Sequence, residues 1–443
     1  MKNSAYAYCV VGNGPNAYLA TSILLHNGKE VLLIDSDKDY SKGSNLLSKL
    51  VLKDRSIKKS LYAQGIPIDH AEKSRIHPVE TKKAGGLTNF WGGMFFPPYI
   101  PYYFQKHQLQ QVHFDEILDL FLTETSSFKN ETQNWNSTYI GVQDKDISKL
   151  IELEPQILTS QADEIWNVSR LFEKLDHSRL HRLDGTCTRI IAQSDSVEME
   201  TRLNNKISRV RAKQVLLACG PIGNAKLLAN SMQNDTVIEL QDSSVSYCIT
   251  VATSKSAFMP NQMRAEKCGF LLEEGRLQAY YQYYRFSEDL IQALRFKFVR
   301  RSIAIINSVL GNRLGLLMIF QNDENSRRIV IRKREEGIEL KSGPRRAFWR
   351  RLRILLKLMK NITSRGLFFP TIFFSGKPGD GAHSAGPDIE ELRKLNNKEQ
   401  LVQEIGVRVH LLGMSATNRV FAGPVTQLSL ALTKMKVENL LDD

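Results

Sequence analysis

Cysteine is scarce in this sequence and shows no pairing pattern. Five cysteines occur among 443 residues, and no two of them have the C-x-x-C spacing that is typical of metal sites and redox motifs. Most of them stand among apolar neighbours, so we expect reduced, buried thiols and neither disulfides nor a metal site. The five are Cys9, Cys187, Cys219, Cys248 and Cys268.

Long apolar runs, internal repeats and low-complexity tracts are also missing. No run approaches the ~20 apolar residues that a membrane-spanning helix needs. The first strand-like segment begins too early to leave room for a secretory leader. The composition, 42% hydrophobic and 24% charged, is that of a folded globular protein and not of a disordered chain. We therefore expect a cytoplasmic protein with more than one structural unit.

Acidic residues are few in one segment, and the positive charge of the chain gathers there. The formal net charge is +13. Between Arg285 and Arg365, 20 Lys and Arg stand against 7 Asp and Glu, an excess of 13 that equals that of the whole chain. Such a basic region indicates an anionic surface or substrate. No recognised nucleic-acid-binding module accompanies it, so we do not expect a nucleic-acid partner.

The N-terminal segment has the order strand, glycine turn, helix, strand and acid, which is the order that binding a dinucleotide requires. Gly12 permits the tight turn, and Gly14 lets the backbone approach the pyrophosphate. The helix would begin at Pro15 and direct its positive end at the phosphates, while Ala17 lets it lie close to the sheet. Asp35 can accept hydrogen bonds from ribose hydroxyls. The alternative is a tight turn that binds nothing.

Further along the chain, glycine turns recur beside apolar runs. An apolar run from residue 214 ends at Gly220 and precedes a helix from about residue 224 to 230, a second unit that a parallel sheet would place beside the first. Between about residues 244 and 340 the pattern changes to alternating strands, which predicts a mostly antiparallel sheet. A final helix is expected to start at Gly423 and Pro424.

The order of these segments resembles that of the glucose–methanol–choline family of FAD-dependent oxidoreductases. Four stretches carry the resemblance. They are the fingerprint with Asp35, the loop 85–91 (GGLTNFW), the unit 217–228, and His383-Ser384-Ala385-Gly386 before the last helix. The loop is closest to that of the family's sugar-oxidising branch.

The resemblance implies an FAD site built from separated parts of the chain. Besides the fingerprint, the implied contacts are Gly85, Gly86, Thr88, Asn89, Trp91, Gly220, Pro424, Val425 and Thr426. A helix that starts at the last three would direct backbone N–H groups at the N1–O2 edge of the flavin. Members that attach FAD covalently carry a histidine where Phe90 stands, so we expect non-covalent FAD.

The same resemblance implies that a histidine removes a hydroxyl proton while a hydride passes to flavin N5. His383 is the candidate base, since its usual pKa is near neutral. The alternative is a loop histidine that caps a turn. The family has a second catalytic residue where this chain has Gly423. His410 is therefore a second catalytic candidate, although its strand-like surroundings favour a hydrogen-bonded structural histidine.

The predicted fold is α/β. It combines a Rossmann-like FAD-binding domain with a mostly parallel sheet and an α+β substrate domain built on an antiparallel sheet. We assign residues 1–100, 183–235 and 376–443 to the first domain, and 101–182 and 236–375 to the second. Two basic amphipathic helices are expected near 288–310 and 345–361.

Arg345 to Lys360 has an apolar stripe and a cationic face. The stripe is Phe348, Leu352, Leu355 and Met359, and no acid stands among the opposite Arg and Lys. Such a helix can lie at an anionic membrane surface. The alternative is a surface helix that packs its stripe on the core.

The expected activity is oxidation of an alcohol group of a sugar or a lipid-linked saccharide, presented at the inner face of the membrane. Two alternatives remain open. One is a non-catalytic flavin-binding or scaffold protein of the same fold. The other is a flavin-dependent reductase or desaturase of another Rossmann-type family.

Overall fold

The computed structural model describes most of the chain outside its N-terminal third. The described residues are 5–36, 94–95, 149–153, 156–157, 168–175, 178–204, 206–232, 235–255, 265–273, 276–286, 297–322, 328–335, 337–343, 348–375, 383–395, 400–420 and 425–442.

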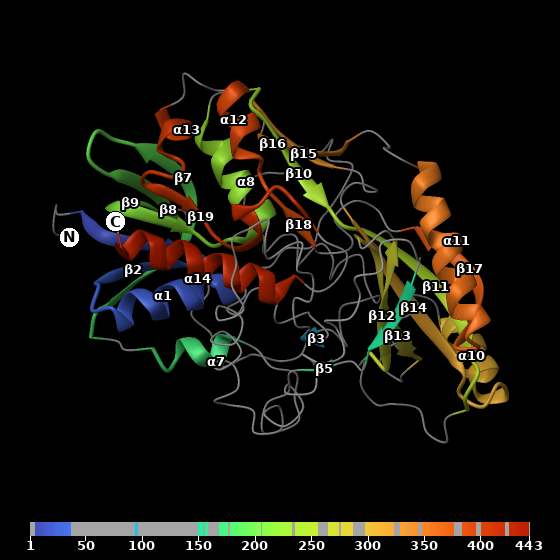
Figure 1. The fold of residues 1–443 in the computed structure, drawn as a ribbon. Coiled ribbons are helices and arrows are strands. Elements are labelled where there is room, and N and C mark those ends of the chain that lie inside the picture. Colours follow the sequence, from blue (N-terminus) through green and yellow to red (C-terminus); the bar gives the residue numbers. More distant parts are fainter. Residues whose placement is uncertain are drawn as a thin grey trace.

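A seven-stranded sheet forms the centre of the α/β part of the molecule (Figure 1). Its order is β6-β2-β1-β9-β8-β7, and β19 pairs with the carboxyl-terminal half of β9. All pairs among β6, β2, β1, β9 and β19 are parallel, whereas β7 and β8 form antiparallel pairs. The strands are β1 (Tyr6–Val11), β2 (Val31–Asp35), β6 (Leu180–Asp184), β7 (Thr186–Ala192), β8 (Val197–Leu203), β9 (Lys206–Leu217) and β19 (Val409–Leu411).

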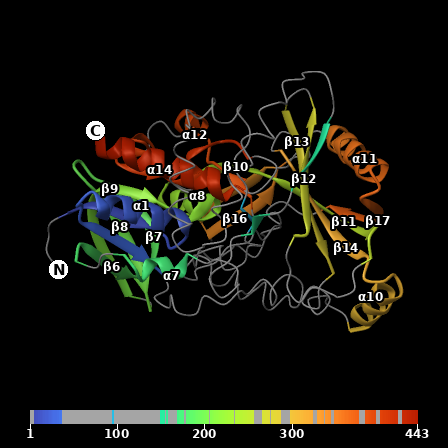
Figure 2. The same cartoon turned by 60° about the horizontal axis from the view of Figure 1, so that its bottom comes forward.

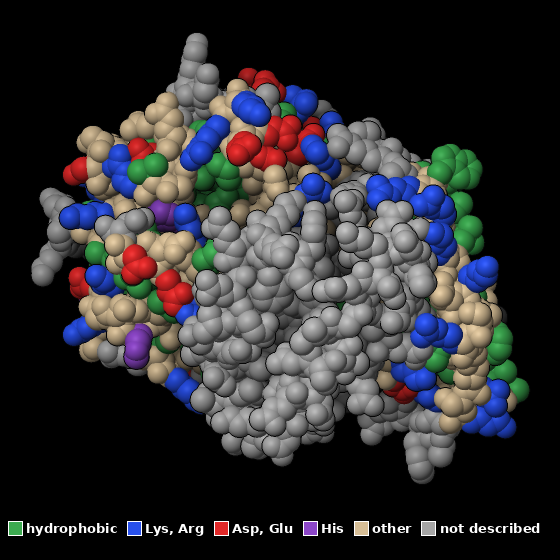
Figure 3. Space-filling model, in the orientation of Figure 1, with side chains coloured by type: hydrophobic (Ala, Val, Ile, Leu, Met, Phe, Trp, Pro, Cys, Tyr) green, Lys and Arg blue, Asp and Glu red, His purple; other side chains and the backbone are tan. Residues whose placement is uncertain are grey.

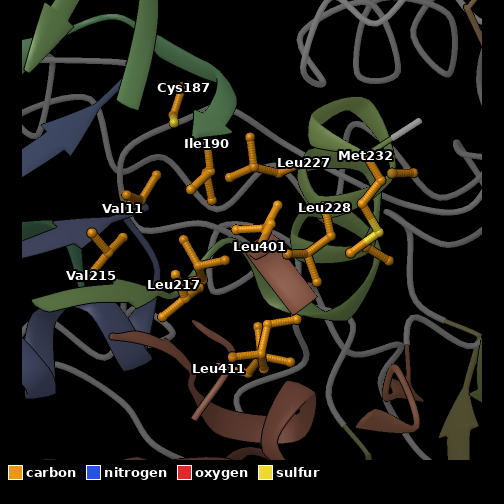
Figure 4. Packing of buried hydrophobic residues seen from close by; sticks show 14 of the residues in the cluster. Val11, Cys187, Ile190, Val215, Leu217, Leu227, Leu228, Met232, Leu401 and Leu411 are labelled. Atoms are coloured by element: carbon orange, nitrogen blue, oxygen red, sulfur yellow. The ribbon is translucent and has the colours of Figure 1, made fainter. Parts of the chain in front are cut away.

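Helices cover both faces of this sheet, because its strands are apolar on both sides. On one face, α1 (Pro15–His26) and α14 (Thr426–Asp442) share a core with Val10, Leu33 and Leu216. On the other face, α8 (Gly220–Ser231) packs against Val11, Val215 and Leu217, as Figure 4 shows. Shorter helices complete this part: α7 (Ser169–Phe172), α12 (Ile389–Leu395), α13 (Gln400–Glu404) and the 3₁₀ helix η5 (Gly413–Ala416).

A four-stranded antiparallel sheet lies over α8. Its order is β16-β15-β10-β18, and the buried apolar residues of β10, β15 and β16 belong to the same core as those of α8. These strands come from the segments expected in the second domain and from the residues after His383. They are β10 (Val237–Asp242), β15 (Ile329–Arg334), β16 (Gly337–Ser342) and β18 (Ser384–Ala385).

A six-stranded antiparallel sheet forms the other end of the molecule (Figure 2). Its order is β17-β11-β14-β13-β12-β4. One face packs against α11 (Phe348–Ser364), and α10 (Lys297–Val309) packs at one end of the opposite face. The strands are β4 (Lys149–Leu153), β11 (Ser244–Ala252), β12 (Lys267–Glu273), β13 (Arg276–Arg285), β14 (Leu314–Gln321) and β17 (Phe368–Ser375). A separate two-stranded pair joins β3 (Met94–Phe95) to β5 (Gln156–Ile157).

The predicted fold class is confirmed, since a sheet rich in parallel strands stands beside antiparallel sheets. The predicted domain limits stay a prediction; one of them, at residue 183, falls inside β6. In the described ranges, no helix is long and apolar enough to cross a membrane. The five cysteines form no disulfide, and the same ranges hold no cluster of metal-binding side chains.

Candidate cofactor and active site

Gly12 lies where the two strand–turn–helix units meet. It follows β1, has φ of +131°, and donates its N–H to Ile34 O at 3.0 Å. A Cβ atom on Gly12 would lie 2.7 Å from the carbonyl oxygen of Ala218, just after β9. The second unit therefore passes so close to the fingerprint turn that only glycine fits, and the predicted tight turn has a steric cause beyond its backbone angles.

The N-terminus of α1 lies at the carboxyl edge of the parallel strands. Gly14 precedes the helix with extended angles and, as the N-cap residue, supplies no side-chain cap; Pro15 is the first residue of the helix. No acid stands in the first turn, so the positive end of the helix has no side-chain counter-charge there. Ala17 is fully buried against the sheet, as the close approach of helix and sheet requires.

Asp35 ends β2 at the same edge. Its side chain is 4% exposed, and its backbone oxygen accepts a hydrogen bond from Gly185 at 2.8 Å. The ends of β1 and β9 lie beside it, because Val11 pairs with Ile34 and Leu217. The structure thus brings Gly12, Gly14 and Asp35 to one edge, which is where ligands bind in sheets of this kind.

Gly220 opens the second helix with φ of +74°, and nothing lies within 4 Å of where its Cβ would be. Its conformation alone favours glycine. The turn is held by Asn224, which the sequence reasoning missed. The Asn224 side chain is completely buried, accepts from Cys219 N at 3.0 Å, and donates to Leu217 O and to Ser415 Oγ at 3.0 and 2.9 Å. A polar residue in an apolar helix was the available signal.

Asn16, which lies within the fingerprint and in the first turn of α1, ties the two ends of the chain together. Its amide donates to Ser429 Oγ at 2.8 Å, and Thr433 Oγ1 donates to Asn16 Oδ1 at 3.0 Å. Gly413 fits against this pair, since a Cβ there would lie 2.3 Å from Asn16 Nδ2. The first turn of α1 therefore positions α14 side by side with it.

The last helix begins close to where the sequence indicates. Thr426 is the first residue of α14, and Val425 O accepts from Ser429 N at 2.8 Å. Both are half-buried. Through Asn16 and Ser429, the beginning of α14 is linked to the beginning of α1. Two helix N-termini from opposite ends of the chain are thus held in a fixed relation.

His383 stands at the junction of the sheets. Its backbone oxygen accepts from Ser243 N at 2.8 Å, directly before β18 pairs with β10. Its ring stacks on Phe320, with centroids 4.9 Å apart and planes at 27°. Nδ1 is buried and has no hydrogen-bond partner within the described ranges. Burial lowers the pKa of His383 from 6.5 to about 4, so the imidazole is neutral at pH 7.

Beside Phe320, the face of the six-stranded sheet that is turned away from α11 carries buried polar side chains. Tyr280 pairs with Phe320, and their rings are 6.2 Å apart. Gln282 Nε2 donates to the Tyr280 hydroxyl at 3.2 Å, and the Tyr284 hydroxyl donates to Gln282 Oε1 at 2.5 Å. The sequence pattern predicts only a strand for this segment. The alternation of Tyr, Gln and Tyr at every second residue was the signal for a polar face.

His410 lies elsewhere in the fold. It is in β19, opposite Leu216 of β9, and its side chain is 3% exposed. Its Nε2 is 2.8 Å from Gln214 Oε1. These are the surroundings of a hydrogen-bonded structural histidine, the alternative named above. No described contact joins it to His383, and its catalytic role stays a prediction.

The remaining predicted contacts lie outside the described residues. They are Gly85, Gly86, Thr88, Asn89, Trp91 and Pro424.

Comparisons with known proteins establish a similarity in fold and nothing finer. No protein-family profile and no curated protein sequence matches the chain. The crystal structure of pyridoxine 4-oxidase from Mesorbium loti is similar, with a TM-score of 0.64 over 99% of this chain and 99% of that chain. The two sequences are 12% identical. At that identity the likeness shows a shared fold and leaves the activity open.

Proposed function

We propose that this chain is an FAD-dependent oxidoreductase of the glucose–methanol–choline type that oxidises an alcohol group. The observation that carries the proposal is the meeting of Gly12, Gly14 and Asp35 at the carboxyl edge of the parallel sheet. The similarity in fold to a pyridoxine 4-oxidase, which covers nearly the full length of both chains, adds support.

The residues at this edge fit a dinucleotide. The uncapped N-terminus of α1 would face the pyrophosphate, and Gly12 leaves the backbone without a side chain in the turn. The buried carboxylate of Asp35 would accept hydrogen bonds from the ribose. Thr426, at the start of α14, would bring backbone N–H groups to the flavin ring.

His383 would act as the base. Because burial holds it neutral at pH 7, it can accept a proton without first losing one. The His383 imidazole would take the hydroxyl proton as the C–H bond of the alcohol breaks and the carbonyl forms. When bound, FAD supplies at N5 the acceptor for the hydride. The stacked Phe320 would hold the imidazole plane.

For the substrate we propose a sugar or a lipid-linked saccharide. The loop 85–91, which resembles that of the family's sugar-oxidising branch, supports this choice. The polar face with Tyr280, Gln282 and Tyr284 is buried, and its groups bond to one another. It lies beside Phe320 and hence beside His383. Pyridoxine, the compound named for the structural neighbour, belongs in the same substrate screen as sugar alcohols and glycosides.

The rival proposal is a flavin-binding protein without catalysis. The low pKa of His383 favours it in one respect, because a base with a pKa of about 4 accepts a proton weakly. Anaerobic bleaching of bound flavin by a substrate separates the two proposals.

The test uses two histidine variants. His383→Ala should retain FAD and lose substrate-dependent bleaching. His181→Ala is the matched control, because His181 is a surface histidine whose Nε2 lies 2.6 Å from Glu30. Bleaching that is equal in wild type and in His383→Ala would place the base elsewhere.

A further inference from the structure

The helices α10 and α11 and the strand β17 lie at the end of the molecule farthest from α1 (Figures 1 and 2). Exposed hydrophobic side chains gather on these three elements. Of the twelve large hydrophobic residues that are exposed in the described ranges, nine belong to α10, α11 and β17. We call these nine the apolar rim. They are Ile305, Ile306 and Val309 of α10, Phe348, Trp349 and Leu356 of α11, and Phe369, Ile372 and Phe373 of β17.

The apolar rim shares only Phe348 with the stripe that the sequence indicates on α11. Leu355 and Met359 of that stripe are buried against the six-stranded sheet. Arg351 fixes the helix further, because its guanidinium donates to Ser246 Oγ at 3.0 Å and to Ser375 Oγ at 2.7 Å. The face of α11 that packs on the protein is therefore already occupied, and Trp349, 77% exposed, points from the other side.

Cations stand among the apolar residues on the side of α11 that is turned away from the six-stranded sheet. A depression on α11 is lined by residues at the i, i+3, i+4, i+7, i+8 and i+11 positions of one helix face. They are Trp349, Leu352, Arg353, Leu356, Lys357 and Lys360. Together α10, α11 and β17 contain eight Lys and Arg and no Asp or Glu. Figure 3 shows basic and hydrophobic side chains side by side along this edge.

We propose that the apolar rim binds the surface of a bilayer that contains anionic lipids. A tryptophan with leucine and isoleucine would enter the boundary between headgroups and acyl chains. Long cationic side chains beside them would reach up to the lipid phosphates. A protein partner fits less well, because the centres of protein interfaces are depleted of lysine, whereas here Lys357 and Lys360 stand beside the apolar residues.

This proposal does not depend on the proposed oxidation, since no residue of the apolar rim belongs to the candidate site. It adds a location at the membrane surface, where an enzyme bound by this end would meet lipid-linked or lipid-dissolved substrates. Vesicle binding and flavin chemistry can be measured separately on the same purified chain, so the failure of one leaves the other standing.

Sedimentation with vesicles tests whether the cations beside the apolar rim contribute to membrane binding. Full-length protein should pellet with phosphatidylglycerol-containing vesicles at about 0.05 M salt and be released at about 0.5 M. Arg353→Glu with Lys360→Glu should weaken this binding about 25-fold or more, since each cation near an anionic surface contributes roughly a fivefold factor. Lys206→Glu with Lys213→Glu, two exposed positions on β9, is the matched control and should bind as wild type does.

A second pair of variants tests the apolar contacts. Trp349→Ser with Leu356→Ser should weaken vesicle binding about tenfold or more. Leu203→Ser with Ile207→Ser removes two exposed apolar residues at the opposite end and should have no effect. Circular dichroism confirms that each variant is folded. Equal binding of all variants, or no binding by wild type, would overturn the proposal. A dimer in solution that Trp349→Ser with Leu356→Ser dissociates, without vesicle binding, would instead assign the apolar rim to a second copy.

Discussion

The imidazole of His383 stacks on the ring of Phe320, with centroids 4.9 Å apart. This contact joins the residue before β18 to the antiparallel sheet. Burial is the cause of the lowered pKa of His383, and Phe320, itself 3% exposed, is part of what buries it. The stacking partner thus contributes to the burial that lowers the pKa of the proposed base.

The first prediction is the pH profile. A base acts only when deprotonated, so kcat/KM should be constant at neutral pH and fall as the pH drops through the lowered pKa of His383, well below 6.5. Phe320→Ser admits water, raises this pKa toward its usual value, and should move the acid limb to higher pH. A limb near pH 6.5 in the wild type would contradict the burial of His383.

The second prediction is that the free energy of unfolding depends on the protonation of His383. The folded-state pKa of His383 lies below its unfolded value, so unfolding takes up a proton between about pH 6.5 and 4. The free energy of unfolding should therefore be unaffected by this group above pH 6.5 and fall as the pH is lowered through that window. Urea titrations of wild type and His383→Gln at several pH values measure the difference, and the variant should show the shallower fall.

Gly12→Ala tests the close approach of the two glycine turns. The added Cβ would meet the Ala218 carbonyl at 2.7 Å, at a φ of +131°. We expect a loss of about 2 kcal/mol or more in stability, together with loss of FAD binding. Gly366→Ala is the control, since Gly366 also has positive φ but has open space around its Cβ position. It should cost about 1 kcal/mol and leave FAD binding intact.

Asn224→Ala tests the second turn. The change leaves Leu217 O, Ser415 Oγ and Cys219 N without their side-chain partner in the interior. Buried groups that lose partners cost roughly 1–3 kcal/mol each, so about 3 kcal/mol of destabilisation is expected. Asn27→Ala, at an exposed hydrogen bond after α1, should cost less than about 1 kcal/mol. Equal denaturation midpoints for the two variants would remove the role given to Asn224.

Asn16 and Ser429 should be energetically coupled. They are 413 positions apart in sequence, and Asn16 Nδ2 lies 2.8 Å from Ser429 Oγ. A double-mutant cycle with Asn16→Ala and Ser429→Ala should give an interaction energy on the order of 1 kcal/mol. Additive effects within the error of urea titrations would show that the contact does not link the two helices.

Local patterns predicted the parts of the fold that depend on neighbouring residues. The glycine turns at Gly12 and Gly220, the strand that ends at Asp35, and the alternation around Tyr281 are all readable over a few positions. Each of these features depends on neighbouring residues, through a positive φ or a two-residue period, and not on contacts with distant parts of the chain.

Pairings between distant segments were not predictable in this way. Nothing local in β10 shows that it joins β15 and β18 over α8, or that Asn16 meets Ser429. The outer face of α11 shows the same limit. Helical spacing identified the apolar side chains, but which of them are buried depends on the sheet beneath, and Trp349 rather than Met359 is exposed.

The visible absorption spectrum of the purified protein tests the central claim most directly. If the carboxyl edge with Gly12, Gly14 and Asp35 holds FAD, the protein is yellow with the two-band spectrum of oxidised flavin. Denaturation should then release FAD into the supernatant, since no covalent bond holds it. A colourless protein that also fails to bind added FAD would contradict the account.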